Sequence, residues 1–112
     1  MYNHVFLIGR TTDKPTISKL ENGQTVGHFT LAVNRPYKNA EGNYDTDFIP
    51  ITVWNGVAIN ANAYCNKGSI ISITGIVIQK EENVLFKKED ENLSKKIRTL
   101  EIYAENVVFI KL

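Results

Sequence analysis

Alternation of apolar and polar residues runs through most of the chain and predicts β-strands. A short apolar run, Val5–Ile8, predicts a buried strand with a bend at Gly9-Arg10. Thr16–Leu20 and Thr25–Val33 both alternate, and the turn-forming residues Glu21–Gln24 lie between them. The first third of the chain therefore predicts a strand followed by a hairpin.

The middle of the chain predicts a long hairpin and then a helix. Asn34–Tyr44 contains proline, glycine and asparagine residues and is expected to be the loop at the hairpin tip. Asp45–Trp54 alternates again and predicts a strand. The alanine-rich segment Asn55–Asn66 suits a short helix that stops at Asn66-Lys67-Gly68.

The last third returns to strands. Ser69–Ile78 is rich in β-branched residues, with Gly75 marking a bulge or bend, and Ile97–Ile110 predicts a final strand. The charge-dense segment between them, Gln79–Lys96, is expected to form a solvated hairpin. This order predicts one all-β domain over residues 1–112: a five-stranded Greek-key barrel of the OB type, with one short helix between its third and fourth strands.

The strand predicted before the helix carries aromatic residues on the face that alternation leaves outward. Ile49, Ile51 and Val53 form its expected core face. On the other face Phe48 and Trp54 lie about 20 Å apart, where a half-exposed strand ordinarily carries polar residues. Outward aromatic rings with cations nearby predict a platform on which bases stack, each contributing roughly 1–3 kcal/mol. The alternative is that both rings fill a second core layer or a subunit interface.

Several segments along nearly the whole chain occur in the order found in a known family. They are Val5–Pro15, Phe29–Arg35, Tyr37–Gly42, Asp47–Trp54 and Tyr64–Ser69, followed by Gly75. Together they resemble the bacterial single-stranded-DNA-binding protein family. The resemblance implies an OB fold, a homotetramer or else a dimer, and single-stranded DNA as the partner in replication, recombination or repair. It implies no catalysis and no cofactor.

The resemblance also implies which residues meet the nucleic acid. The family's base-stacking aromatics, carried over position by position, fall on Tyr37, Phe48 and Trp54. A further aromatic expected after the fourth strand falls near Glu82, so Phe86 is its nearest substitute. Neighbouring cations are expected to meet phosphates. The complete expected set is Arg10, Lys14, Arg35, Tyr37, Lys38, Phe48, Thr52, Trp54, Lys80, Phe86, Lys87 and Lys88.

The chain departs from the family pattern at its end. Family members typically continue into a long tail whose acidic tip recruits other proteins, whereas this sequence stops at Leu112, directly after the last expected strand. It therefore resembles either the short family members or a longer member from which the tail has been removed, and recruitment through a tail does not carry over with the resemblance. An alternative function is a protein-interaction module on the same fold, similar to a primosomal accessory protein, with the aromatic row buried in a partner.

Charge and cysteine content refine these expectations. Thirteen lysines and arginines against twelve acidic residues give a net charge of +1, so affinity should depend more on stacking than on counterion release. One cysteine, Cys65, forms no internal disulfide and is expected to be a buried structural thiol. One cysteine and the isolated His4 and His28 do not make a zinc site, so no metal is expected.

The location follows from the same composition. No signal peptide and no apolar run long enough to span a membrane is found in the sequence. The expected location is therefore the cytoplasm, and the resemblance to a DNA-binding family implies association with the nucleoid.

Overall fold

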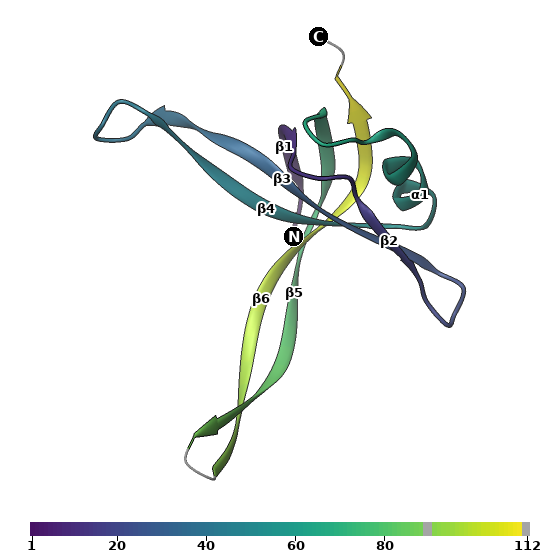
Figure 1. Cartoon of the computed structure of the whole chain (residues 1–112), viewed down its shortest axis with the longest axis vertical. Helices are drawn as coiled ribbons and strands as arrows, with labels where there is room; N and C mark the ends of the chain where they lie inside the picture. The colour runs from purple at the N-terminus through teal and green to yellow at the C-terminus, as the bar shows by residue number, and fades with distance from the viewer. Residues whose placement is uncertain (89–90, 111–112) are drawn as a thin grey trace.

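Five strands close into a barrel in this protein, whose computed structural model describes the backbone of residues 1–88 and 91–110 and their side chains outside residues 84–94. A sixth, short strand pairs with the outside of the barrel, and one helix follows the third barrel strand (Figure 1). The predicted all-β OB barrel with a single helix is confirmed. The barrel strands are β1 (Val5–Thr11), β3 (Thr25–Lys38), β4 (Tyr44–Trp54), β5 (Ile70–Lys88) and β6 (Glu91–Phe109); β2 (Thr16–Lys19) is the outer strand and α1 (Asn55–Tyr64) the helix.

Strand β1 closes the barrel because it pairs on both sides. Its whole length to Arg10 pairs with β5, and its last two residues pair with β3, with Arg10 opposite Ala32. On the far side of the barrel β4 and β6 run parallel, so that Thr52 lies beside Tyr103. The other pairs are antiparallel. Strand β4 therefore lies between β3 and β6.

The barrel interior is filled by the apolar faces that alternation predicts. Phe29 and Leu31 of β3 and Ile51 and Val53 of β4 are buried together, and Ile49 packs against them. Strands β5 and β6 and the helix complete the core. Burying this many apolar side chains is the main favourable contribution to folding.

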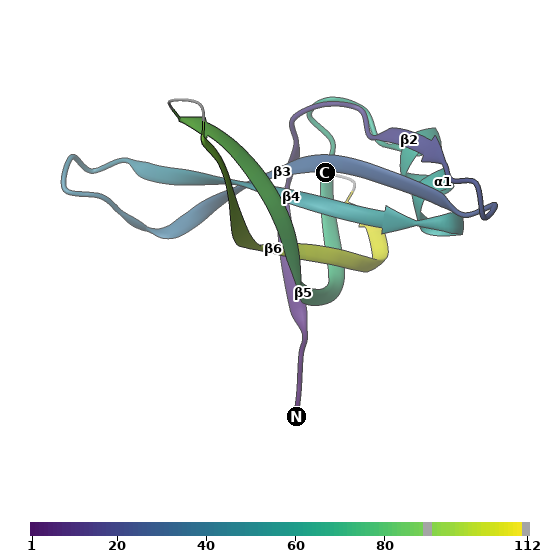
Figure 2. The same ribbon diagram turned by 90° about the horizontal axis from the view of Figure 1, so that it is seen from below.

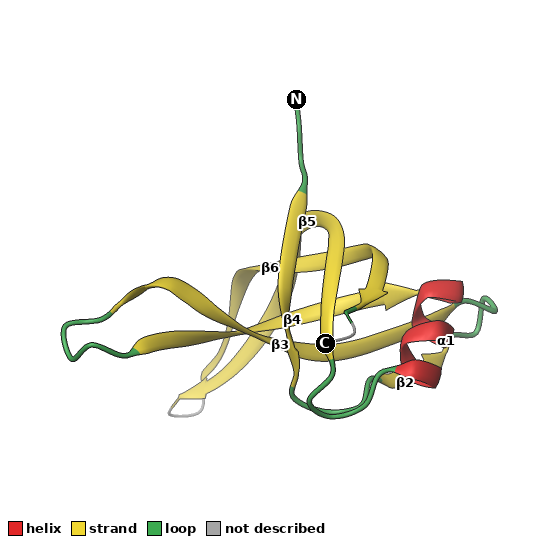
Figure 3. Cartoon of the chain, turned by 90° about the horizontal axis from the view of Figure 1, so that it is seen from above, coloured by secondary structure: helices red, strands yellow, loops and turns green. Residues whose placement is uncertain are grey.

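Helix α1 covers one end of the barrel, next to β2 (Figure 3). It approaches closely because Gly27 of β3 has no side chain there. A Cβ on Gly27 would lie 2.9 Å from Val53 Cγ2 and 3.3 Å from Ala58 Cβ. Ala58 and Ala61 face the core, and Cys65 is buried with them, as predicted. Burial raises the pKa of the Cys65 thiol, as is typical of a structural cysteine.

Two hairpins extend beyond the barrel as arms, both away from α1 (Figures 1 and 2). In the first arm β3 continues to Lys38, which pairs with Tyr44. The predicted loop Asn34–Tyr44 was therefore too long, and only residues 39–43 make the turn. Proline and asparagine favour a loop locally, but cross-strand pairing with β4 extends the strand through this segment, with a bulge after Asn34.

The second arm is formed by β5 and β6. The predicted irregularity at Gly75 is confirmed by a register shift between Thr74 and Gly75. A Cβ on Gly75 would run into the carbonyl oxygen of Tyr103, so only glycine fits this close approach. Beyond it the strands leave the barrel, and Leu100 is 73% exposed although it lies two residues from Ile102, which packs against the core. No opposing layer covers Leu100 in the arm.

Candidate nucleic-acid interface

The ring of Phe48 lies open on the outer face of the barrel. It is 65% exposed, as the alternation in β4 predicts. Its cross-strand neighbour is Ala32, which in turn neighbours Arg10 of β1. A depression of about 450 Å³ lies among these residues, and we call it the Phe48 groove. Its lining is Ile8, Gly9, Arg10, Ala32, Asn34, Thr46, Phe48 and Ile70.

Arg10 supplies the charge of the Phe48 groove. Its Nη1 donates a hydrogen bond of 2.9 Å to the carbonyl oxygen of Gly68, which holds the guanidinium beside the groove. A guanidinium has five N–H donors, so this single bond leaves donors for an anionic ligand. Among the lining residues of this groove the formal charge is that of Arg10 alone. The groove thus combines one exposed aromatic ring with one cation.

A second depression follows along the same face toward α1, and we call it the Thr52 groove. It measures about 290 Å³. Thr52 itself is only 5% exposed, and its Oγ1 lies 3.3 Å from His28 Nδ1 in a hydrogen bond. Lys14 belongs to the lining, and no ion pair is recorded for it among the residues that the structure describes. The lining is Thr12, Asp13, Lys14, Thr16, His28, Phe29, Thr30, Pro50, Ile51, Thr52 and Glu101.

Trp54 occupies a different environment from Phe48, although both are on one face of β4. Its ring is half-buried and makes an edge contact with Tyr103 of β6, at 5.8 Å between centroids and 62° between planes. The indole N–H is buried without a hydrogen-bond partner among the described residues. Trp54 is therefore partly a packing residue. For this ring the contact supports the alternative given from the sequence, in which the outward aromatic residues fill a second core layer.

The β3–β4 arm carries two further exposed rings. Tyr37 is 61% exposed, and Lys38 Nζ lies 5.9 Å from the ring centroid of Tyr44, in a cation–π contact. Tyr44 is also exposed and, by alternation, points to the same side of β4 as Phe48. Sequence reasoning missed Tyr44 because it was assigned to the loop. The even spacing from Tyr44 to Phe48 was the available signal.

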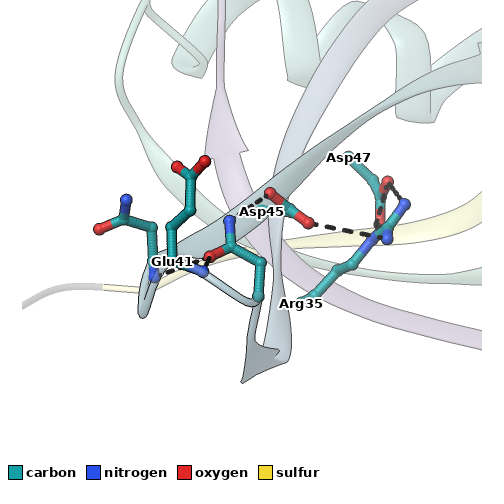
Figure 4. A network of polar contacts seen from close by, with 6 residues as sticks. Arg35, Glu41, Asp45 and Asp47 are labelled. Atoms are coloured by element: carbon teal, nitrogen blue, oxygen red, sulfur yellow. Dashed lines mark hydrogen bonds and ion pairs between the residues drawn. The ribbon is translucent and has the colours of Figure 1, made fainter.

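Arg35 is engaged within the arm itself. Its Nε and Nη2 donate to both carboxylate oxygens of Asp47 at 3.0–3.3 Å, and its Nη1 lies 3.9 Å from Asp45 (Figure 4). Asn39 at the turn donates to Asp45 as well. The hydrogen bond to Asp47 raises the pKa of Arg35 and lowers that of Asp47. The guanidinium meets two carboxylates here, so it is less available to a phosphate than its sequence position suggests.

Two cations of the β5–β6 arm are paired as well. Lys80 Nζ lies 3.3 Å from Glu101 Oε1, and this hydrogen bond raises the pKa of Lys80. Arg98 pairs with Glu81 at 3.2 Å across the same hairpin. The side chains of Phe86, Lys87 and Lys88, three of the expected contact residues, lie outside the described part of the structure.

Among the side chains that the structure describes, those of residues 1–83 and 95–110, no group of three histidine, cysteine or acidic residues is placed to hold a metal ion. Helix α1 is neither long enough nor apolar enough to cross a membrane.

The closed five-stranded barrel, with its single helix after the third strand, defines an OB-fold protein. The family described as "Single-strand binding protein family" matches residues 2–110, and the chain belongs to this family. The expected family resemblance is thus confirmed.

Curated relatives agree with this assignment. "Single-stranded DNA-binding protein B" of Bacillus subtilis (strain 168) is 43% identical over 75 residues, which cover 67% of this chain and 66% of that protein. "Single-stranded DNA-binding protein" of Halalkalibacterium halodurans is 36% identical over 111 residues, or 99% of this chain and 62% of the relative. "Single-stranded DNA-binding protein 3" of Listeria innocua is 37% identical, covering 99% and 65%. The chain matches just under two thirds of the length of each relative.

Proposed function

We propose that this chain binds single-stranded DNA without reading its sequence. The supporting observation is the exposed ring of Phe48, which lies in a groove beside the cation Arg10 on the outer face of an OB barrel. A ring with a free face accepts any base, because every base has a π-face. Family membership and the printed names of the relatives point to the same ligand.

The proposed path of the strand follows β3 and β4. It passes the exposed rings of the arm, Tyr37 and Tyr44, then the Phe48 groove, and continues into the Thr52 groove. The two grooves follow one another along β3 and β4, because the cross-strand pair Ala32 and Phe48 lines one, and the pair Thr30 and Pro50, two positions away, lines the other. Bases stack on the rings, and Arg10, Lys14 and Lys38 face phosphates. Trp54 borders this path and contributes mainly by supporting it.

The proposed activity is coverage rather than chemistry. A strand bound along this face is protected and cannot fold on itself, which serves DNA replication, recombination and repair. The chain acts as one binding domain over residues 1–112, without catalysis, in the cytoplasm with the nucleoid. We propose a homotetramer, as in the family expectation, with a dimer as the alternative. Light scattering coupled to size-exclusion chromatography measures this mass directly.

The test is titration with poly-dT, in which binding is measured as quenching of the fluorescence of Trp54, the only tryptophan. We expect Phe48→Ala to weaken binding roughly 5- to 150-fold, since it removes one stacked base worth about 1–3 kcal/mol. Tyr64→Ala is the matched control, because Tyr64 is an equally exposed ring on α1 outside both grooves. The proposal fails if, at low salt, poly-dT does not quench the Trp54 fluorescence of the folded wild-type protein and the protein does not change the gel mobility of labelled poly-dT. The protein-interaction alternative then gains support.

A further inference from the structure

His28 lies in the Thr52 groove in a position that no stacking role explains. It is exposed on the outer face of β3, opposite Thr16 of β2 and Thr52 of β4. Its Nδ1 is hydrogen-bonded to the buried Thr52 hydroxyl, which holds the ring in place. In the described hydrogen bonds Nε2 takes no part, so this nitrogen is left for a ligand.

The charged residues around His28 determine how protonation of its imidazole changes the charge of the groove. Lys14 and Asp13 lie in the loop before β2, and Glu101 comes from β6. The neighbouring residues on β2 and β4, Thr16 and Thr52, are uncharged hydroxyl residues. One lysine and two carboxylates therefore give this lining a formal charge of −1 when the imidazole is neutral, and Lys80, outside the lining, pairs with the carboxylate of Glu101 at 3.3 Å. A protonated imidazole brings the lining to zero and adds a second cationic donor beside Lys14.

We propose that His28 contacts the phosphate backbone of bound single-stranded DNA in the Thr52 groove, and that protonation of its imidazole adds this contact as the pH falls. The inference rests on the proposed function and names a titratable contact within that site. A histidine changes its charge between about pH 8 and pH 5. In the protonated ring both nitrogens donate, so Nδ1 bonds Thr52 while Nε2 bonds a phosphate oxygen.

The experiment measures poly-dT affinity and its salt dependence at about pH 8 and about pH 5.5. We expect wild-type protein to bind about three- to tenfold more tightly at the lower pH. Each phosphate contact to a single strand adds about 0.7 to the slope of log K against log salt, so the slope should steepen by up to about this amount.

Three variants separate His28 from other titrating groups. His28→Asn keeps a side chain able to bond Thr52 but carries no charge, so its affinity should be the same at both pH values. His28→Lys carries a permanent charge and should bind tightly at both. His4→Asn is the matched control, since the chain has two histidines and His4 lies on the N-terminal segment beside Tyr2, outside the groove.

The outcomes distinguish this inference from the proposed function. If His28→Asn keeps the wild-type pH dependence while still binding poly-dT, the assignment of His28 is overturned and the function stands. If wild-type protein binds more tightly at low pH with an unchanged salt slope, the contact is not to phosphate and the proposal is likewise overturned. If the folded wild-type protein binds poly-dT at neither pH, both fail. Thermal unfolding of each variant at both pH values confirms that the compared proteins are folded.

Discussion

The two grooves on the outer face differ in their lining, although the same two strands run through both. The Phe48 groove has an exposed ring, apolar neighbours and the single cation Arg10. The Thr52 groove has four threonines in its lining, with Lys14 and His28 near two carboxylates. One is suited to the flat face of a base, and the other to the polar backbone of the strand.

This difference comes from the strands that border β4 at each end. Near Phe48 the paired strand is β3, whose small residue Ala32 leaves the ring open, and β1 lies on the other side of β3. Near Trp54 the parallel strand β6 places Tyr103 against the ring. An identical alternation along one strand therefore yields an open ring at one end and a packed ring at the other. The role of an outward aromatic residue depends on which strand lies next to it.

The largest expected effect separates these two rings by their contribution to folding. We expect Trp54→Ala to lower the free energy of unfolding by about 2–3 kcal/mol, because a half-buried ring and its contact with Tyr103 are lost. Phe48→Ala should change it by no more than about 0.5 kcal/mol, since most of that ring is exposed.

Urea unfolding followed by circular dichroism measures both values. Tyr103→Ala is the companion variant, since it removes the partner ring and should destabilise the protein in the same direction as Trp54→Ala. Equal losses for Phe48→Ala and Trp54→Ala would contradict the distinction between an open and a packed ring.

Alternation predicted much of this arrangement, because a strand exposes every second residue whatever its neighbours are. It placed Ile51 and Val53 in the core and Phe48 outside, and all three positions agree with the structure. It also placed Thr52 and Trp54 outward, where the structure buries the first and half-buries the second. Alternation identifies the face of a residue, but what covers that face comes from a strand some fifty residues later in the chain.

The charged residues show the same limit more strongly. Arg35 and Lys80 were expected near phosphates from their positions in the sequence. In the structure each meets a carboxylate on the partner strand of its hairpin, Asp47 and Glu101 respectively. Such pairs depend on strand register, which one sequence does not specify for long hairpins with a bulge. The availability of a cation is therefore a property of the folded protein.

The second-largest expected effect tests whether a cation must lack a carboxylate partner in the folded protein in order to contact DNA. We expect Lys14→Gln to reduce the slope of log K against log salt by about 0.7, as the loss of one phosphate contact predicts. Lys80→Gln is the matched control, because Lys80 is held by Glu101 and has a raised pKa from that hydrogen bond. It should change the slope by clearly less. Titration of poly-dT at several salt concentrations gives both slopes. A larger change for Lys80→Gln than for Lys14→Gln would contradict the phosphate contact assigned to Lys14 in the Thr52 groove.

The smallest expected effect concerns the arm that continues the Phe48 groove. Arg35 holds the pKa of Asp47 below its usual value. The interaction therefore stabilises the arm at pH values above the pKa that Asp47 has in the unfolded chain, about 4. This contribution is lost as the pH falls through the lower pKa of the folded protein. Below that pH we expect the Arg35 Nε–H to exchange faster with solvent in proton–nitrogen NMR spectra. The reason is that protonated Asp47 no longer accepts all of its hydrogen bonds from Arg35.

Asp47→Asn reproduces the acidic state at neutral pH, and it also frees Arg35 for a phosphate. We expect its poly-dT affinity to rise by about twofold and its salt slope to steepen by no more than about 0.7, since Asp45 still lies near the guanidinium. The double variant Arg35→Gln with Asp47→Asn is the control and should lose the gain. If Asp47→Asn binds no better than wild type, Arg35 serves only to hold the arm, and phosphate contacts are confined to the two grooves and Lys38.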